Sequence, residues 1–260
     1  MVGGWCSLSR AVLPVVCDTG VMPSDRTPTA SRSAPSIRAR VRAEMADEIK
    51  VIARRHLASG GASLSLRAVA RDLGVVSSAL YRYFPSRDDL LTALIIDAYD
   101  ALGSAVEAAD AAVLNRSDLR TRWLACSHAV RRWALANPAE YALVFGSPVI
   151  GYAAPLDTIP AALRTPSALV GILADGVASG VLTVSGSPPL PADLAEDLRR
   201  VRAEFWPTVP EELLARGTIG WIHLFGAVSF ELFGQLNNAI DAREAYFNVQ
   251  MGLMADLIGL

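Results

Sequence analysis

Residues 66–84 most constrain the fold, because they hold two short amphipathic segments separated by a glycine. The first, Leu66–Leu73, follows Ser65, whose hydroxyl can cap a helix by accepting a hydrogen bond from a free backbone N–H. It stops at Gly74, which can adopt the backbone conformations of a tight turn. The second is predicted to be a helix over Ser77–Phe84. Two short helices joined by a glycine-containing turn of about three or four residues indicate a helix-turn-helix.

A longer amphipathic helix is predicted ahead of this pair, over Ile37–Ala58, and Gly60-Gly61 ends it. We expect Ala70 to let the two short helices cross closely, with Val75 and Leu80 filling the angle between them. The apolar residues that recur along the longer helix at close to helical spacing are Val41, Met45, Ile49, Ile52 and Leu57. The three segments together predict a small helical domain.

The predicted third helix has an outer face suited to DNA. Small residues near its N-terminus permit close approach to base edges, and the positive end of the helix dipole favours phosphate. Arg82 can bond to a guanine edge, whereas a tyrosine hydroxyl usually contacts a phosphate oxygen. The residues predicted to lie on this face, or to reach DNA from this helix, are Ser77, Ser78, Ala79, Tyr81, Arg82 and Tyr83.

Charge is distributed unevenly along the chain, whose net charge is −2. Residues 37–91 carry ten Arg or Lys against six Asp or Glu, a net +4, whereas residues 92–260 carry eleven against eighteen, a net −7. A basic module joined to an acidic one suits a protein that meets a polyanion at one end. The net charge of +4 in residues 37–91 is equally compatible with ordinary surface charge. The helix-turn-helix motif has to decide between a polyanion-binding module and an ordinary charged surface.

Leu66–Arg87, with the sequence LRAVARDLGVVSSALYRYFPSR, resembles the N-terminal domain of the TetR/AcrR family of bacterial repressors. Leu80–Phe84 followed by Pro85-Ser86-Arg87 is the most specific part. One position departs from the family pattern: Val76 stands where Ser or Thr usually caps the recognition helix, so Ser77 is the alternative cap. The resemblance implies DNA contacts from Ser65, Arg67, Ser77, Tyr81, Tyr83 and Arg87, the last in place of a usual Lys.

Only helical stretches are predicted beyond residue 91, so the fold class is all-α: an N-terminal three-helix helix-turn-helix domain and a larger C-terminal helical domain. Loops are predicted at the proline-rich segments Pro148–Pro166 and Ser185–Pro191. The predicted helices are Arg87–Ala112, Leu119–Asn137, Ala139–Phe145, Ser167–Gly180, Ala192–Phe205, Pro210–Asn237 and Ala242–Leu260.

Three regions follow from these predictions. Residues 1–36 are expected to be a disordered N-terminal arm, since Met22–Ser36 is rich in Ser, Thr and Pro; Met22 is also an alternative first residue. Residues 37–91 are the predicted DNA-binding domain. Residues 92–260 are the predicted effector-binding and dimerisation domain.

The resemblance implies a homodimer formed through the last two helices, and an effector pocket in the same domain. A two-fold axis would also let two recognition helices read a palindrome. Two apolar stripes are predicted to form either the dimer seam or the core of one chain; they are Leu214, Trp221, Phe225, Val228 and Leu232, and Phe247, Met251, Met254 and Ile258.

Aromatic residues of the C-terminal region are candidates to line a pocket for a small, mostly apolar effector, and are equally compatible with plain core. His223 lies in an apolar helix, where it is either a core histidine or a polar anchor for the effector. Trp221, His223 and Gly226 also resemble the Trp-His-Gly signature of one TetR subfamily. The candidate effector-binding residues are Trp123, Tyr141, Phe145, Trp221 and His223.

Several other classes of site are not predicted. The cysteines Cys6, Cys17 and Cys126 form neither a spaced pair nor a Cys/His cluster, so no disulfide or metal site is expected. No nucleophile motif, phosphate loop or catalytic carboxylate pair is present, so we expect no enzyme activity, no catalytic residue and no cofactor. The apolar runs Tyr141–Leu156 and Gly217–Phe230 are broken or short beside the roughly 18 residues of a membrane span.

The predicted function is a cytoplasmic, sequence-specific DNA-binding transcriptional regulator. We expect it to be a repressor that binds a palindromic double-stranded operator as a homodimer and is released by its effector. The alternative is a helical small-molecule-binding protein, or a minor enzyme, that keeps this fold without binding DNA.

Overall fold

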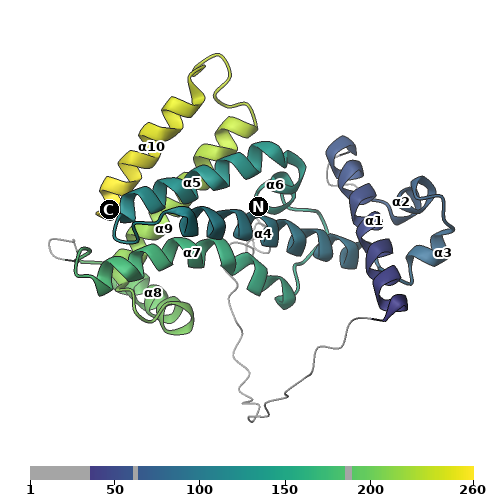
Figure 1. Ribbon diagram of the computed structural model, residues 1–260, viewed down its shortest axis with the longest axis horizontal. Helices are drawn as coiled ribbons and strands as arrows, with labels where there is room; N and C mark the ends of the chain where they lie inside the picture. The colour runs from purple at the N-terminus through teal and green to yellow at the C-terminus, as the bar shows by residue number, and fades with distance from the viewer. Residues whose placement is uncertain (1–35, 61–63, 185–188) are drawn as a thin grey trace, which may run out of the picture. The chain divides into compact units, whose positions relative to one another are not determined.

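A computed structural model describes residues 36–60, 64–184 and 189–260, and every regular element within these ranges is helical (Figure 1). The predicted all-α fold class is confirmed. The chain divides into two compact units: an N-terminal unit that runs to Thr92 and includes Gly151–Ile159, and a C-terminal unit of Ala93–Ile150 and Pro160–Leu260. The predicted arm lies, except for Ser36, outside the described residues.

The N-terminal unit contains α1 (Ile37–Gly60), α2 (Leu66–Asp72), α3 (Ser77–Leu80) and the start of α4 (Arg87–Ala112). The predicted cap of α2 is confirmed, because the Ser65 Oγ accepts a hydrogen bond from the Ala68 amide at 3.4 Å. The side chains that form the core are Ile49, Ala53, Leu57, Leu64, Leu66, Val69, Ala70, Leu80, Phe84, Leu90 and Leu91. Of the stripe predicted along α1, Val41 is exposed and does not join this core.

A segment from much later in the chain completes the N-terminal unit. Gly151–Ile159 follows α6 (Pro138–Phe145) and ends at the first residue of α7 (Ile159–Ala178), and it includes a short 3₁₀ helix, Leu156–Thr158. The hydroxyls of Tyr152 and Thr92 are hydrogen-bonded at 2.9 Å. The base of α4 is therefore tied to a segment about 60 residues away in sequence.

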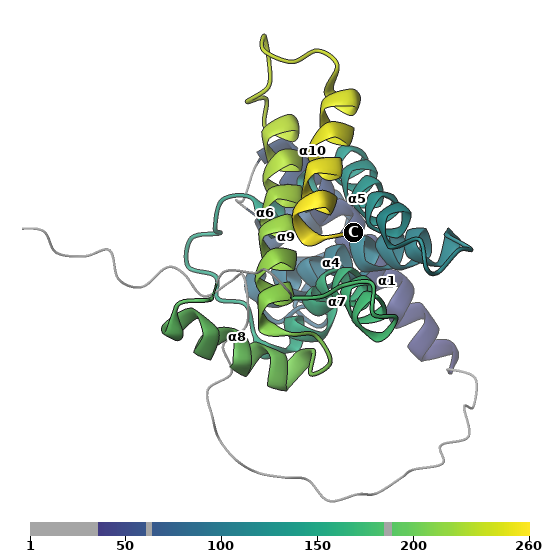
Figure 2. The ribbon, with the colours of Figure 1, turned by 90° about the vertical axis from the view of Figure 1, so that its left-hand side faces the viewer.

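The C-terminal unit is a helical bundle. Besides most of α4, it contains α5 (Leu119–Ala136), α6, α7, α8 (Ala192–Phe205), α9 (Glu211–Leu232) and α10 (Arg243–Ile258). The chain turns after α9 so that α10 runs back beside it, with α5 against both (Figure 2). Gly220 permits this close packing, because a Cβ there would lie 2.8 Å from Ile258 and 3.2 Å from Trp123.

The structure corrects the predicted loop at Pro148–Pro166, since α7 already begins at Ile159. Pro160 is tolerated because it stands in the first turn, where its missing N–H has no helical partner to lose. Pro166 lies inside the helix and removes one hydrogen bond there. The prolines therefore misled the prediction over eight residues, 159–166.

The two apolar stripes offered as a dimer seam on α9 and α10 belong to the core of the C-terminal unit. Val228, Met251 and Ile258, for example, are fully buried within one chain, and the remaining members are buried or packed against that core. For the six buried members the seam interpretation is wrong, and the alternative, that they form the core of one chain, is confirmed. Trp221, Leu232 and Met254 are half-buried and pack against that core. Other residues of the same two helices face outward, as described below.

One described helix, α9, is long and apolar enough to cross a membrane by length and composition alone. It packs against α5, α6, α8 and α10. Its Glu231 is buried and forms a paired ion contact with Arg131, in which Nε and Nη2 lie 2.8 and 2.7 Å from the carboxylate oxygens. These contacts place one apolar face of α9 in the core of a bundle.

Candidate nucleic-acid interface

The turn between α2 and α3 positions the residues predicted to contact DNA. We call the surface formed by these predicted contacts the reading face. Gly74 adopts a positive φ of 74°, as the turn requires, and the Val75 amide donates to the Ala70 carbonyl at 3.0 Å. Leu80 is buried and anchors α3 from inside. The predicted roles of Gly74 and Leu80 are confirmed.

The helix α3 is shorter than predicted. It covers Ser77–Leu80, and Tyr81 and Arg82 continue as a turn. Val76 is the N-cap and makes no side-chain capping hydrogen bond, so Ser77 is the first helical residue rather than the substitute cap. The start of the recognition helix therefore lacks the hydroxyl that most helices use there.

Three polar side chains among the predicted DNA contacts are exposed and uncommitted. Among the described residues, the hydroxyl of Tyr81 and the guanidinium groups of Arg67 and Arg82 have no hydrogen-bond or ion-pair partner. Arg87 differs, since its guanidinium lies 3.5 Å from Asp88. Of the other candidates, Ser65 and Ser78 are exposed, and Ser77, Ala79 and Tyr83 are half-buried.

One side chain from the N-terminal half of α1, Arg42, contacts the turn that follows α3. The Arg42 Nη2 donates to the backbone carbonyl of Arg82 at 2.9 Å, and the same guanidinium lies 5.3 Å from the centre of the Tyr83 ring. This cation–π contact and the hydrogen bond fix the turn that carries Arg82. Sequence reasoning missed Arg42, because its partners are 40 residues away.

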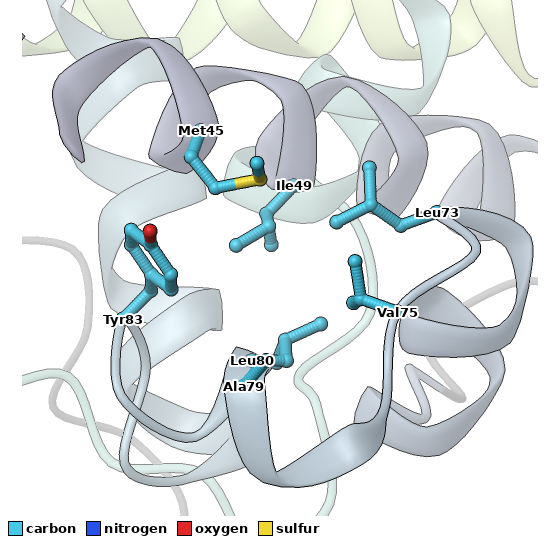
Figure 3. A pocket seen from close by; sticks show the side chains of 7 residues that line it. All are labelled: Met45, Ile49, Leu73, Val75, Ala79, Leu80 and Tyr83. Carbon is cyan, nitrogen blue, oxygen red and sulfur yellow. The ribbon is translucent and has the colours of Figure 1, made fainter. Parts of the chain in front are cut away.

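An apolar hollow of about 80 Å³ lies behind the reading face, between α1, the turn and α3 (Figure 3). Its volume is well below the roughly 300 Å³ at which small-molecule sites begin. It is a packing gap of the helix-turn-helix core. Its lining side chains are Met45, Ile49, Leu73, Val75, Ala79, Leu80 and Tyr83.

Comparison with protein families identifies the chain. Residues 52–94 match the model described as bacterial regulatory proteins of the tetR family, and residues 123–254 match the tetracycline-repressor-like C-terminal domain. The second match alone spans half of the chain. The chain belongs to the TetR family. It is therefore a DNA-binding transcriptional regulator.

Relatives and solved structures of TetR-like proteins agree with this assignment. The HTH-type transcriptional regulator Rv1816 of Mycobacterium tuberculosis is 40% identical over 201 residues, 75% of this chain and 83% of the relative. The regulatory protein SCO4313 has a crystal structure that is 32% identical, with a TM-score of 0.68, and covers 86% of this chain and 100% of its own.

A third comparison supports the fold alone. The TetR family regulator PfmR of Thermus thermophilus is 20% identical, with a TM-score of 0.50 over 78% of this chain and 96% of its own. Members of the TetR family bind DNA, and they typically act as dimers that respond to small-molecule ligands. The Trp-His-Gly subfamily resemblance stays a prediction.

The structure gathers three of the five candidate effector residues around one ring. Phe145, Trp221 and Tyr141 have ring centres 4.3, 5.6 and 6.4 Å from that of Phe225. Tyr141 is fully buried, and its hydroxyl donates to the Phe225 carbonyl at 2.9 Å; burial raises the pKa of Tyr141 to about 12. We call Tyr141, Phe145, Trp221 and Phe225 the aromatic cluster.

The other two candidates lie elsewhere in the C-terminal unit. Trp123 is buried, and its indole Nε1 donates to the Met251 carbonyl at 3.0 Å. The His223 Nε2 lies 3.0 Å from the Gln250 side-chain oxygen, a contact that joins α9 to α10. The Trp221 Nε1, in contrast, is buried and has no hydrogen-bond partner among the described residues.

Replacing Val76 by threonine is expected to stabilise the recognition helix, because it restores a hydroxyl at the N-cap. We expect the free energy of opening of residues 77–84 to rise by about 1 kcal/mol. Amide hydrogen exchange over these residues measures the change. Val76→Ala is the matched control, and equal protection in the two variants would contradict this account of the cap.

Proposed function

We propose that this TetR-family chain is a cytoplasmic repressor that binds a palindromic operator as a homodimer and dissociates when a small, mostly apolar effector binds. The N-terminal unit would read DNA, and the C-terminal unit would dimerise and hold the effector. The uncommitted polar groups of Tyr81, Arg67 and Arg82 carry this proposal, since exposed cations and a free hydroxyl donor suit a polyanionic ligand. No catalytic role is proposed for any residue.

We propose that some residues of the reading face position the protein on the DNA backbone and that others recognise the base sequence. Arg82 is the candidate to bond a guanine edge, and Tyr81 is the candidate to hold a phosphate. The remaining proposed DNA contacts are Ser65, Arg67, Ser77, Ser78, Ala79, Tyr83 and Arg87.

Homodimerisation is supported by an apolar face that the folded chain leaves exposed. On α9, Ile219, Ile222 and Phe230 are more than half exposed, and Gly226 between them has open space above its backbone. Four apolar or aromatic residues of α10 are also exposed; they are Tyr246, Val249, Leu253 and Leu257. The spacings of 3, 4 and 4 residues place each set along one helix face. We call these residues the outer face, and it is the proposed seam.

The effector is proposed to contact the aromatic cluster and to accept a hydrogen bond from the Trp221 Nε1. A buried N–H without a partner costs about 1–3 kcal/mol, so an acceptor that reaches it gains that amount. Trp123, Tyr141 and His223 already bond within the chain. The proposed ligand is therefore an apolar molecule with a carbonyl or ether oxygen.

Selection of bound duplexes from a random DNA library tests the proposed function. We expect the chain to enrich one palindromic sequence. A folded chain that enriches no sequence, yet is stabilised by small apolar molecules, would instead favour a ligand-binding protein that no longer uses its DNA-binding fold.

Tyr81→Ala and Arg82→Ala are expected to separate positioning from sequence reading. Tyr81→Ala should weaken binding to every sequence alike, since a phosphate contact carries no sequence information. Arg82→Ala should relax the preference at one base pair, with a loss of about 1–3 kcal/mol on the preferred base. Competition binding with single-base-pair variants of the enriched site distinguishes these outcomes. Uniform loss for Arg82→Ala would exclude a base-reading role.

Trp221→Phe is expected to weaken effector binding about tenfold while keeping the ring contacts of the cluster. Thermal-shift titration with apolar compounds that carry a single carbonyl measures this, using matched hydrocarbons as ligand controls. Trp133→Phe, on α5, is the control variant. An equal response of both variants to the carbonyl compounds would contradict the role of Trp221.

A further inference from the structure

The first two turns of α1 bury no side chain, and only Arg42 at their end contacts another described element. Residues 36–44 are all exposed, including the apolar Ile37 and Val41. The helix is nevertheless properly started, because the Ser36 Oγ accepts a hydrogen bond from the Ala39 amide at 3.2 Å. Most helices in folded proteins are held by burial of one face, which this stretch does not provide. Another interaction would explain why the stretch is helical.

The charges of this stretch oppose its own helix. Its first turn has no acidic residue and carries Arg38 and Arg40, although the positive end of the helix dipole favours anions there. Arg38 and Arg42 are also four residues apart, a spacing at which like charges repel. Arg38 and Arg40 have no hydrogen-bond or ion-pair partner among the described residues. Such local conflict is typical of a surface that meets a ligand of opposite charge.

The register of α1 separates these arginines. Ile49 and Met45 line the hollow against α3, and Arg42 contacts Arg82 and Tyr83. Residues three or four apart share a helix face, so Arg38 lies on the same face as Arg42, Met45 and Ile49. It is one turn closer to the start of α1, about 6 Å from Arg42. Arg40 is two residues from each and lies on the opposite side of the helix. Arg38 therefore lies on the face of α1 that contacts α3 and the turn after it, and Arg40 does not.

We infer that Arg38 and Arg42 extend the DNA interface and that Arg38 binds a backbone phosphate outside the base pairs read by α3. This inference rests on the proposed DNA binding. A phosphate suits Arg38 because its exposed guanidinium has no partner among the described residues to orient it toward a base edge. The contact lengthens the footprint of each subunit and adds affinity without changing sequence preference.

The test compares Arg38→Ala with Arg40→Ala, which removes the same charge from the opposite side of the same turn. Binding to the enriched palindrome and to a scrambled duplex is measured over a range of salt. For Arg38→Ala we expect a loss of roughly tenfold at low salt on both duplexes. The slope of log affinity against log salt should become less steep by about 0.9 for each phosphate that is no longer neutralised, or about 1.8 for a dimer. Arg40→Ala should behave as the unaltered chain.

A charge-preserving variant and a shorter duplex complete the experiment. Arg38→Lys should retain most of the affinity of the unaltered chain for DNA. Removing flanking base pairs should weaken DNA binding by the unaltered chain but not by Arg38→Ala.

If the unaltered chain binds no duplex, the proposed function itself fails. If it binds while Arg38→Ala keeps the same affinity and salt slope, only the inference about α1 is overturned. Melting curves for each variant confirm that helix content is intact.

Discussion

Replacing Arg122 by alanine is expected to lower the free energy of unfolding by about 3–5 kcal/mol. Only 2% of this residue is exposed, and its guanidinium joins three helices of the C-terminal unit. It donates to Asp110 at 2.7 and 3.1 Å, to Asp175 at 2.7 Å and to the Arg116 carbonyl at 3.2 Å. Alanine removes all of these bonds and leaves a carboxylate without its main partner.

The charge state of Asp110 explains why the loss is large. Burial raises the pKa of this carboxyl, but hydrogen bonds from Arg122 and Arg116 lower the pKa by more, to below its ordinary value. Asp110 is therefore charged at neutral pH, and in Arg122→Ala this partly buried charge keeps only Arg116 as its partner. Urea denaturation at pH 7 measures the effect, with the exposed Arg132→Ala on α5 as the control. Equal losses in the two variants would contradict the account.

Charged substitutions on the outer face are expected to abolish the dimer and to weaken operator binding by about 10²–10⁴-fold. The double variant Ile222→Glu with Leu253→Glu places four carboxylates at a two-fold seam, because each change occurs in both copies. Both positions are more than half exposed in one chain, so the fold should survive. The affinity falls because two linked half-sites become independent.

Sedimentation and DNA binding together test the outer face. We expect the double variant to sediment as a monomer at micromolar concentration, with unchanged helix content. Leu114→Glu is the control, since this residue is 92% exposed but lies in the loop before α5. A double variant that stays dimeric, or a monomeric variant that binds the palindrome at full affinity, would exclude the outer face as the functional seam.

The sequence predicted the helix-turn-helix well, because its signals are local. The Ser65 cap of α2, the turn at Gly74 and the burial of Leu80 each depend on residues nearby in the sequence. The outward side of the predicted third helix and the family resemblance then named the candidate DNA contacts, which stay predictions. The end of α3 was less predictable, since the aromatic run after Leu80 fits a helix or a turn equally.

The sequence did not predict which faces of α9 and α10 are exposed, nor the contacts of Arg42. Both α9 and α10 have apolar residues on two faces, and helical spacing cannot say which face packs within the chain. The stripe with Val228 and Met251 became core, while Ile222 and Leu253 stayed outside. Arg42 could be identified only once α1 was placed against the turn after α3, because no local pattern links residues 40 apart.

The salt dependence of binding to the selected palindrome tests the central claim most directly. A repressor with uncommitted Tyr81, Arg67 and Arg82 should bind it as a dimer far more tightly than a scrambled duplex, with affinity falling steeply as salt rises. Equal, weak binding to both duplexes at every salt concentration, by a folded and dimeric chain, would contradict the account of this protein as a sequence-specific regulator.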